Sequence, residues 1–328
     1  MNLPSLPASE LLAARVQAWQ AWCQTDPQAK CSATRRLAAW GHRTNALRAP
    51  QSRARNPDAD DPGKDDPGKD DPGADELSAS APGAVDLEIT DLARSDFERA
   101  LVDPPLRPGR PARPLLVHPR QVPDRGVGSE VGRAALLHAI AHIEFNAIDL
   151  ALDAIWRFDE MPSHWVSDWI RVALDEARHF TMLQAELRLR GHEYGDFEAH
   201  DGLWEMALRT RDDVLLRVAL VPRLLEARGL DVTPRIIERL RGAGDRRAIA
   251  ILEVILREEV AHVAIGNAWF HRLCEQRGLD PRVAWDGLAQ AHAVASPAPP
   301  FNRTARMQAG FDESELQRWE ERARIARL

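Results

Sequence analysis

The chain has 328 residues, of which 44% are hydrophobic, so it can bury one sizeable core with extensions. Nine acidic residues and two lysines between residues 56 and 76 account for the net charge of −7, so the rest is near neutral and suggests no polyanionic partner. The three cysteines share no metal-ligand spacing, which argues against a disulfide framework and a zinc knuckle.

The same sequence gives no sign of a membrane protein. Its N-terminal residues lack the apolar core and cleavage site of a signal peptide. No stretch reaches about 18 uninterrupted apolar residues, so no transmembrane helix is expected. We therefore expect a cytoplasmic protein with no membrane partner.

Composition divides the chain into five parts. Apolar residues recur at helical spacing over residues 9–24, and a second short helix is expected over Ala33–Arg43. A DDPGK-type repeat over Asp60–Ala74 predicts disorder, because proline and glycine break regular structure and the acidic side chains repel one another. The parts are an N-terminal helical extension (1–48), a disordered acidic linker (49–84), an extended proline-rich lead-in (85–128), a helical bundle (129–278) and a C-terminal strap and helix (279–328).

Four long helices are expected within the bundle, with no competing strand pattern. They cover Ser129–Phe158, Ser163–Gly191 with Ser163 as its N-cap, Leu203–Arg228 and Asp245–Arg277. We expect Pro222 to kink the third helix, Gly229–Thr233 to interrupt it, and a short helix over Pro234–Arg241 to continue it coaxially. The loop of about 12 residues before the third helix is long enough for a crossover along the bundle. Helices of this length are typical of bundles, so the predicted fold class is all-α.

Each of these helices carries a carboxylate in the stripe that faces the predicted core. The first and third stripes contain a single glutamate, whereas the second and fourth each contain a Glu-x-x-His motif. That spacing places both side chains about one turn apart on the same helix face. The six residues are Glu144, Glu176, His179, Glu226, Glu259 and His262.

This arrangement needs a physical cause. An ionised carboxylate buried without a partner costs several kcal/mol, and four carboxylates in one core also repel one another. Two divalent cations would neutralise four carboxylates, while two imidazoles supply neutral nitrogen ligands. Two single glutamates with two Glu-x-x-His motifs are the pattern of ferritin-like dinuclear metal bundles. We therefore predict a ferritin-like four-helix bundle that holds two Fe ions, or Mn, because the ligand types suit both metals.

Other interpretations of these residues stay open. The six residues could form buried salt bridges in a metal-free bundle. His138 and His142 face roughly 120–200° away from Glu144, so they are expected at an interface or outside the ligands. Tyr194 and the tryptophans are expected to pack in the core.

Two acids beside the motifs are candidates for a supporting role. Asp175 and Glu258 immediately precede the motif glutamates and are expected either to be solvated or to orient the histidines. Arg178 and Arg257 are expected to pair with these acids.

Several longer motifs resemble one family. The segments GRAALLHAIAHIEFNAIDLALD, DEARHF, YGDFEAHDGLWE, VPRLLEARGLDVTP, REEVAHVAIG and PPFNRTARMQAGF resemble the DUF455 family of ferritin-like bacterial proteins over about residues 100–312. The resemblance implies the ferritin-like fold and a dinuclear metal site. More distant relatives include a tRNA hydroxylase of the MiaE type and N-oxygenases of aromatic amines, with a Glu-Ala-Arg similar to residues 226–228. The tail Pro299–Phe311 is expected to form a strap that closes the bundle.

Three functional hypotheses follow. The first is an O2-dependent di-iron oxidase or hydroxylase that acts on an unknown small molecule and draws on an electron donor. It needs a cavity beside the metals, for which Ala147, Ala173 and Gly266 leave room. The second is iron or manganese binding without turnover, although the extensions at both ends argue against assembly into a storage shell; a monomer or homodimer is compatible with the first hypothesis.

The third hypothesis is a tRNA-modifying hydroxylase of the MiaE type. It requires an arginine-rich face beside the site, whereas solvated helix faces are the preferred interpretation of the arginines near the third connection. These are Arg223, Arg228, Arg235, Arg239, Arg241, Arg246 and Arg247.

Overall fold

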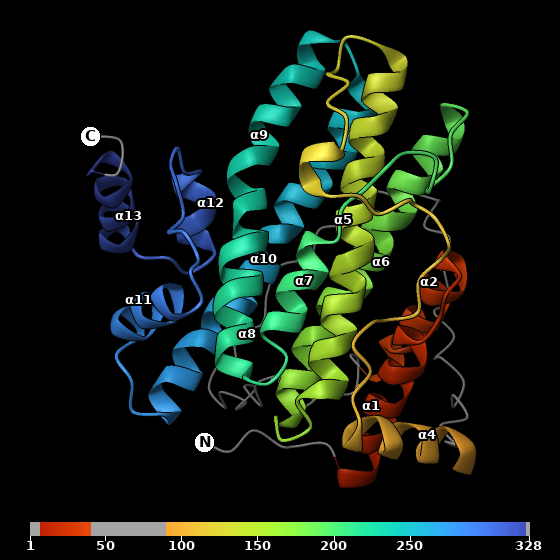
Figure 1. Ribbon diagram of the computed structural model, residues 1–328, viewed down its shortest axis with the longest axis vertical. Helices are drawn as coiled ribbons and strands as arrows, with labels where there is room; N and C mark the ends of the chain where they lie inside the picture. The colour runs from red at the N-terminus through yellow and green to blue at the C-terminus, as the bar shows by residue number, and fades with distance from the viewer. Residues whose placement is uncertain (1–6, 41–89, 326–328) are drawn as a thin grey trace, which may run out of the picture.

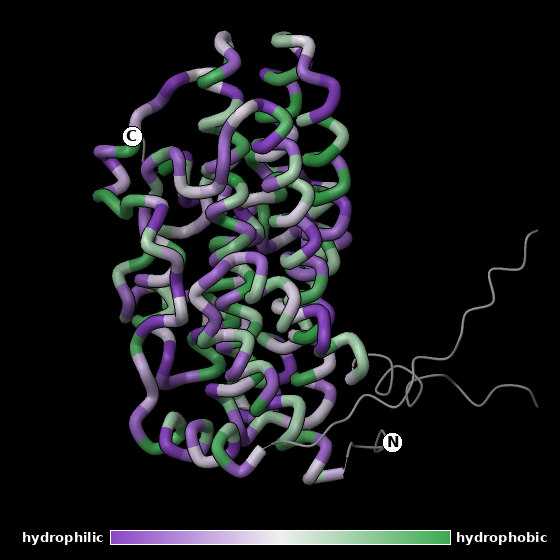
Figure 2. Tube along the Cα trace, turned by 90° about the vertical axis from the view of Figure 1, so that its right-hand side faces the viewer, coloured by the Kyte–Doolittle hydropathy of each residue, from purple (hydrophilic) through white to green (hydrophobic). Residues whose placement is uncertain are grey.

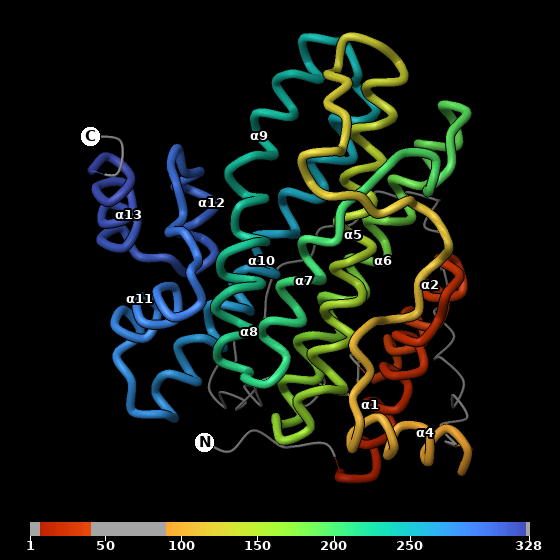
Figure 3. The backbone as a smooth tube through the Cα atoms, in the orientation of Figure 1, coloured from red at the N-terminus to blue at the C-terminus, as the bar shows by residue number. Residues whose placement is uncertain are grey.

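The computed structural model describes residues 7–40 and 90–325 of the chain, and the acidic repeat lies outside these residues. The described part is an all-α helical bundle, which confirms the predicted fold class (Figure 1). Helices pack along most of their length, and one isolated bridge joins Leu116 and Ala199 within the described residues. The backbone course is easiest to follow in Figure 3.

The first half of the bundle is an antiparallel hairpin. Helix α5 covers Glu130–Arg157, and the Ser129 side chain caps it by accepting a hydrogen bond from the Gly132 amide. Helix α6 covers Ser163–Leu189 and follows after a short turn, so Ser163 is its first residue rather than its N-cap. Arg15 donates hydrogen bonds to the carbonyls of Phe158 and Met161 in this turn, at 2.9 and 2.7 Å. These bonds satisfy backbone acceptors that the end of α5 leaves free.

The third rod of the bundle differs most from prediction. The single helix expected over Leu203–Arg228 is wrong, because the chain turns between Thr210 and Asp213. The Asp213 side chain accepts a hydrogen bond from the Leu215 amide and starts a new helix there. The segments are α7 (Gly202–Arg209), α8 (Val214–Leu220), a π-helical turn η2 (Val221–Glu226) and α9 (Ala227–Gly242).

The predicted interruption at Gly229–Thr233 is also wrong, since α9 runs through it and through Pro234 without a break. The buried side chains of Leu230, Ile237 and Leu240 keep α9 packed, and this packing offsets the hydrogen bond that proline cannot donate. The expectation that Pro234–Arg241 continues the third rod is confirmed.

Pro222 produces a widened turn rather than a simple kink. It lacks the N–H that would close an α-helical turn, and η2 takes its place. Pro222 presses against Gly266 of α10 (Arg246–Gln276), where an added Cβ would lie 2.4 Å from the Pro222 Cβ. The absence of a side chain at Gly266 lets the two rods approach this closely. Sequence analysis expected Gly266 to leave open space; Pro222 fills that space instead.

The chain crosses the length of the molecule between the two hairpins. Figure 1 shows α6 and the α8–α9 rod running in the same direction, while the segment that contains α7 returns the chain. Helices α9 and α10 then form the second antiparallel hairpin. This connectivity brings four rods together along their middle sections, which is where the predicted ligands lie.

Helices from both ends of the chain cover the bundle. At the N-terminal end, α1 (Ala8–Trp22) and α2 (Pro27–Arg36) lie beside α5 and α6, and α4 (Asp91–Val102) packs on α1. At the C-terminal end, α11 (Pro281–Ala291) and α12 (Arg303–Gln308) lie beside α8, α9 and α10, and α13 (Glu313–Ile325) lies on the outer side of α12.

Two of these covering helices differ from expectation. Helix α2 begins at Pro27, six residues before the predicted Ala33, with Asp26 as its cap. Helix α4 was not expected within the proline-rich lead-in, of which the part after Val102 is irregular apart from a short 3-10 turn, η1 (Pro119–Gln121).

One described helix is long and apolar enough to cross a membrane. This is α5, of which 72% of the apolar window is buried inside the bundle. Figure 2 shows hydrophobic and hydrophilic residues interleaved along the helices, the pattern of rods that bury one face. The apolar character of α5 therefore serves the protein core.

The contact between Pro222 and Gly266 generates a stability prediction. We expect Gly266→Ala to destabilise the metal-free protein by about 1–3 kcal/mol, because the new methyl group overlaps the proline ring. Gly229→Ala is the control: its Cβ would meet nothing within 4 Å, and alanine favours a helix by up to about 1 kcal/mol over glycine. Chemical denaturation measures both, and equal stabilities for the two variants would contradict the prediction.

Candidate metal centre

The bundle places the six predicted residues on four rods at the same depth. Helix α5 supplies Glu144, α6 supplies the first Glu-x-x-His motif, η2 supplies Glu226, and α10 supplies the second motif. Glu144, Glu176, His179 and His262 are buried residues, and the Glu259 side chain is 14% exposed. The Oε2 atom of Glu226 is also buried.

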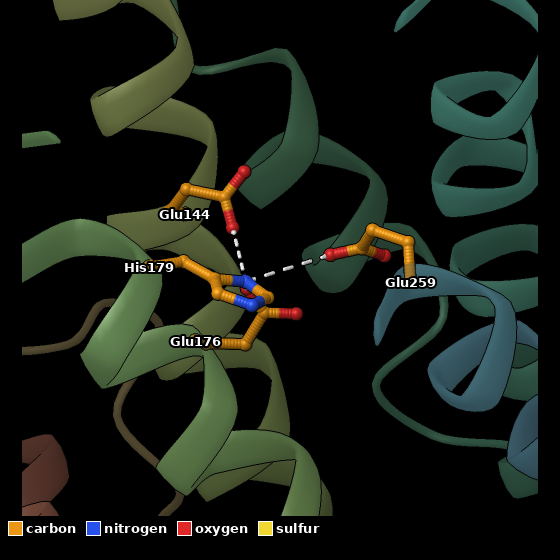
Figure 4. A group of neighbouring side chains, drawn as sticks. All are labelled: Glu144, Glu176, His179 and Glu259. Atoms are coloured by element: carbon orange, nitrogen blue, oxygen red, sulfur yellow. Dashed lines mark hydrogen bonds and ion pairs between the residues drawn. The ribbon is translucent and has the colours of Figure 1, made fainter. Parts of the chain in front are cut away.

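His179 lies at the centre of one half of this cluster. Its Nδ1 atom is 3.1 Å from Glu144 Oε2, 3.4 Å from Glu176 Oε2 and 3.9 Å from Glu259 Oε1. Figure 4 shows these four side chains pointing toward one another from α5, α6 and α10. One potential ligand atom from each lies within 4.8 Å of all the others. This buried group can hold a metal ion.

His262 occupies the equivalent position in the other half. Its Nδ1 atom is 3.0 Å from Glu176 Oε1 and 3.5 Å from Glu259 Oε1. Glu176 and Glu259 therefore lie near both histidines, whereas Glu144 approaches only His179 within ion-pair distance. Glu226 forms no hydrogen bond or ion pair with the other five residues in the described part of the chain, but the charges of Glu259, Glu176 and His262 act on it, so it lies near this half.

The outward-facing nitrogens of the two histidines are held by a crossed pair of acids. His179 Nε2, on α6, lies 2.7 Å from Glu258 Oε2 on α10. His262 Nε2, on α10, lies 3.2 Å from Asp175 Oδ2 on α6. Arg178 donates to both acids, at 2.8 Å to Asp175 and 2.6 Å to Glu258. Of the two roles expected for these acids, the geometry thus favours orienting the histidines.

This outer layer fixes the tautomers. A carboxylate only accepts hydrogen bonds, so each Nε2 carries the proton and donates it outward. The Nδ1 lone pairs of neutral histidines then point into the carboxylate cluster. Histidines that bind metals commonly donate their other nitrogen to a carboxylate in this way. Arg257 lies 3.6 Å from Glu258, as expected, but the shorter contacts of that acid are to Arg178 and His179.

The donor set fits a cation better than it fits an internal network. Both Glu176 oxygens, Glu226 Oε2 and His262 Nδ1 are buried and make no hydrogen bond to any described residue. Glu176 Oε1 lies 3.0 Å from His262 Nδ1, yet the two are misaligned for a hydrogen bond. Unpaired buried carboxylate oxygens are costly, and a divalent ion is the partner that would satisfy several at once.

Without metal, the cluster must hold protons. Burial, with the charges of Glu259 and Glu176, raises the pKa of Glu226 to about 8. Burial opposes a charge on His179, but its hydrogen bond to Glu144 and the nearby charges of Glu144 and Glu176 outweigh it and raise the His179 pKa to about 11. Burial and the charge of Glu176 raise the pKa of Glu144 as well. A protonated imidazole and a protonated carboxyl thus replace the missing positive charge.

His138 and His142 lie outside the cluster, on the side of α5 that faces the crossover. His142 Nδ1 accepts a hydrogen bond from the Tyr194 hydroxyl at 2.9 Å, and its Nε2 lies 3.2 Å from the His200 carbonyl. His138 Nε2 accepts from the Gly195 amide at 2.9 Å. Both histidines therefore connect the crossover to α5, and Tyr194 is partly buried and packs against the core.

Sequence reasoning missed how some arginines near the third rod are used. Arg223 was grouped with solvated arginines, yet its side chain is 2% exposed and pairs with Glu315. Arg247 pairs with Glu186 at 3.0 Å, and Arg241 pairs with Glu238. No signal in the local sequence distinguishes Arg223 from its neighbours, because its partners come from the C-terminal helices.

Fold and cluster together define an all-α bundle protein with a buried carboxylate–histidine group. The family model described as "Protein of unknown function (DUF455)" matches residues 79–317, and the chain belongs to this family. The resemblance of the motifs to DUF455 is thereby confirmed. A protein of Haemophilus influenzae described as an uncharacterized protein is 49% identical over 213 residues, covering 63% of this chain and 74% of that protein. No solved structure matches.

The crossed acids generate a prediction about metal affinity. We expect Asp175→Ala or Glu258→Ala to weaken metal binding by about 10–100-fold, because the histidine on the opposite helix loses its orienting acceptor. Glu253→Ala removes an exposed acid from α10 and is the control. Isothermal titration calorimetry with Mn(II) measures the metal affinities of the wild type and the three variants. If all three variants bind as the wild type does, the acids do not orient the histidines.

The protons held by the metal-free cluster generate a second prediction. Coordination needs neutral imidazole and ionised carboxylate, so metal must displace protons from groups such as His179 and Glu226, whose pKa values are raised. Binding should therefore release protons, and affinity should rise from about pH 6 to about pH 8. Calorimetry in buffers with different ionisation heats counts the protons. An affinity that falls over this range would contradict the prediction.

Proposed function

We propose that this protein is a ferritin-like dinuclear metal protein that binds two iron ions and acts as an O2-dependent oxidase or hydroxylase on a small molecule. The single observation that supports it best is the convergence of four carboxylates and two histidine nitrogens in the bundle interior. The family match supports membership but carries no reaction.

The residues divide naturally between two ions. Glu144 and His179 would hold one ion, and Glu226 and His262 the other. Glu176 and Glu259 would hold both, because each lies near both histidines. Four carboxylates then balance the charge of two divalent cations. When bound, iron would supply the electrons for reaction with O2, while the protein excludes water and holds the ligands in place.

The covering helices favour an enzyme over a storage protein. A storage shell requires bundles that pack directly against one another. Here α1 and α2 cover one flank of the bundle, and α11 to α13 cover another (Figure 1). A bundle covered in this way suits a single chain or a small assembly that acts on a substrate and receives electrons from an external donor.

Metal loading tests the proposal. Anaerobic addition of Fe(II) should give about two ions per chain, and exposure to air should then consume O2. Glu176→Ala and Glu259→Ala should each abolish loading, because each removes a ligand that both ions share. His142→Ala should load as the wild type does, because its contacts are to Tyr194 and His200.

Three outcomes would contradict the proposal. Wild-type protein that takes up less than about half an equivalent of Fe(II) or Mn(II) would exclude the dinuclear site. Loss of loading in His142→Ala would show that the ligands were assigned to the wrong face of α5. A large shell on gel filtration would favour storage.

A further inference from the structure

The π-helical turn that carries Glu226 is held by the far end of the chain. We call residues 302–319, which include α12 and the first half of α13, the C-terminal clasp. The clasp contacts the third rod on both sides of Glu226, through Arg223 before it and Asp231 after it. Figure 3 shows these C-terminal helices beside α8, α9 and α10.

Arg223 makes the first of these contacts. Its guanidinium donates to Glu315 of α13 and lies over four aromatic rings. These rings are Phe270 at 4.6 Å, Trp285 at 4.8 Å, Phe311 at 5.1 Å and Trp319 at 5.6 Å. Its Nε and Nη1 atoms make no hydrogen bond to the described residues, so the ring faces are their partners.

Arg306 makes the second contact, from the clasp toward the rod. It forms a fork with Asp231, at 3.0 Å through Nε and 2.6 Å through Nη2, and it also donates to the Ala227 carbonyl at 3.3 Å. Ala227 directly follows Glu226 in the chain. Asn302 adds a backbone bond to Asp231 at 2.9 Å and a side-chain bond to the Leu230 carbonyl at 3.2 Å.

A π-helical turn needs such support. It is a rare conformation that loses part of the regular hydrogen-bond ladder, so contacts outside the helix must favour it over an ordinary α-turn. A change from π to α geometry over Val221–Glu226 would rotate Glu226 relative to α10. From the bundle side, the missing N–H of Pro222 and its close approach to Gly266 favour the turn.

We infer that the C-terminal clasp holds η2 in the geometry that presents Glu226 to the carboxylate–histidine cluster, with Arg223 as the positioning residue. This inference rests on the proposed dinuclear site. Among the described residues, Arg223 forms no hydrogen bond or ion pair with the proposed metal ligands of α6 or α10, so its influence on the cluster passes through η2. Binding of the ion held by Glu226 and His262 would thereby depend on the C-terminal clasp. Arg223 and Glu315 are 92 residues apart in the chain.

The test replaces the buried ion pair without leaving a single buried charge. In Arg223→Met/Glu315→Leu both partners become apolar, which buried sites tolerate far better than the loss of one partner. We expect metal stoichiometry to fall from about two to about one, because Glu144, Glu176, His179 and Glu259 still form one site. Hydrogen exchange over residues 221–231 in the metal-free protein should also accelerate by at least about tenfold.

The control removes a buried ion pair that links the same rod, through Arg217 of α8, to Asp153 of α5, which also pairs with Arg157. Arg217 and Asp153 are 2% and 0% exposed and lie 2.6 Å apart, but neither bonds to η2. Arg217→Met/Asp153→Leu should keep about two ions even if its unfolding temperature falls. A purely structural role for the clasp would move both double variants alike.

Each outcome decides the question. Two ions bound to Arg223→Met/Glu315→Leu with unchanged affinity, or unchanged exchange over residues 221–231, would overturn the inference. If the double variant does not fold, Arg306→Lys replaces it, because lysine keeps the charge opposite Asp231 but loses the two-pronged hydrogen bond. This variant should lower the affinity for the second ion alone. An equal loss of affinity for both ions would overturn the inference. If the wild type binds no metal, the proposed function fails, and the exchange measurement still judges the clasp.

Discussion

The structure depends on balancing negative charge inside an apolar bundle. Four carboxylates reach one region of the interior, and only two histidines lie among them to offset the charge. Burial raises the pKa values of Glu144 and Glu226, and the neighbouring carboxylates raise that of His179, so in the absence of a cation bound protons balance the charge. Each long apolar helix that contributes to this region carries charged or imidazole side chains over about one turn of its otherwise apolar core-facing stripe.

The crossed acids show how two helices become one site. Asp175 and Glu258 each belong to one Glu-x-x-His helix and bind the histidine of the other, while Arg178 joins them at the surface. A shift of α6 along α10 would therefore break both contacts together. The register of the two helices and the orientation of the imidazoles are set by the same hydrogen bonds.

Much of this could be predicted from sequence because it follows from helical periodicity. A carboxylate that interrupts an otherwise apolar stripe, as Glu144 does, identifies both the buried face and its special residue. The predicted helix boundaries in the third rod were wrong. Gly229 and Pro234 suggested that a helix ends there, but α9 continues through both residues because its buried face packs against the bundle. Helix α4 was missed among prolines, although Thr90 and the spacing of Phe97 and Ala100 mark it.

Arg223 illustrates the limit of such reasoning. The arginine beside Pro222 was expected on a solvated helix face, because it lies in a stretch of the chain that contains several other arginines. Its partners, Glu315 and Trp319, come from a helix that begins almost 90 residues later, at Glu313. A long-range contact of this kind is decided by tertiary packing, which a pattern within one helix does not encode.

Lys30 bears on the architecture of the whole chain. Only three of the 43 basic residues are lysines, and Lys30 is the one within the described part. Its ammonium donates to Asp149 of α5 and to the carbonyls of Trp22 and Gly109, at 3.2 and 2.8 Å for the carbonyls. A compact charge with three diverging donors matches these acceptors, whereas a planar guanidinium does not. A buried ion pair thus joins the second helix to the bundle, and separating the two would leave Asp149 with Arg110, 4.0 Å away, as its remaining charged partner.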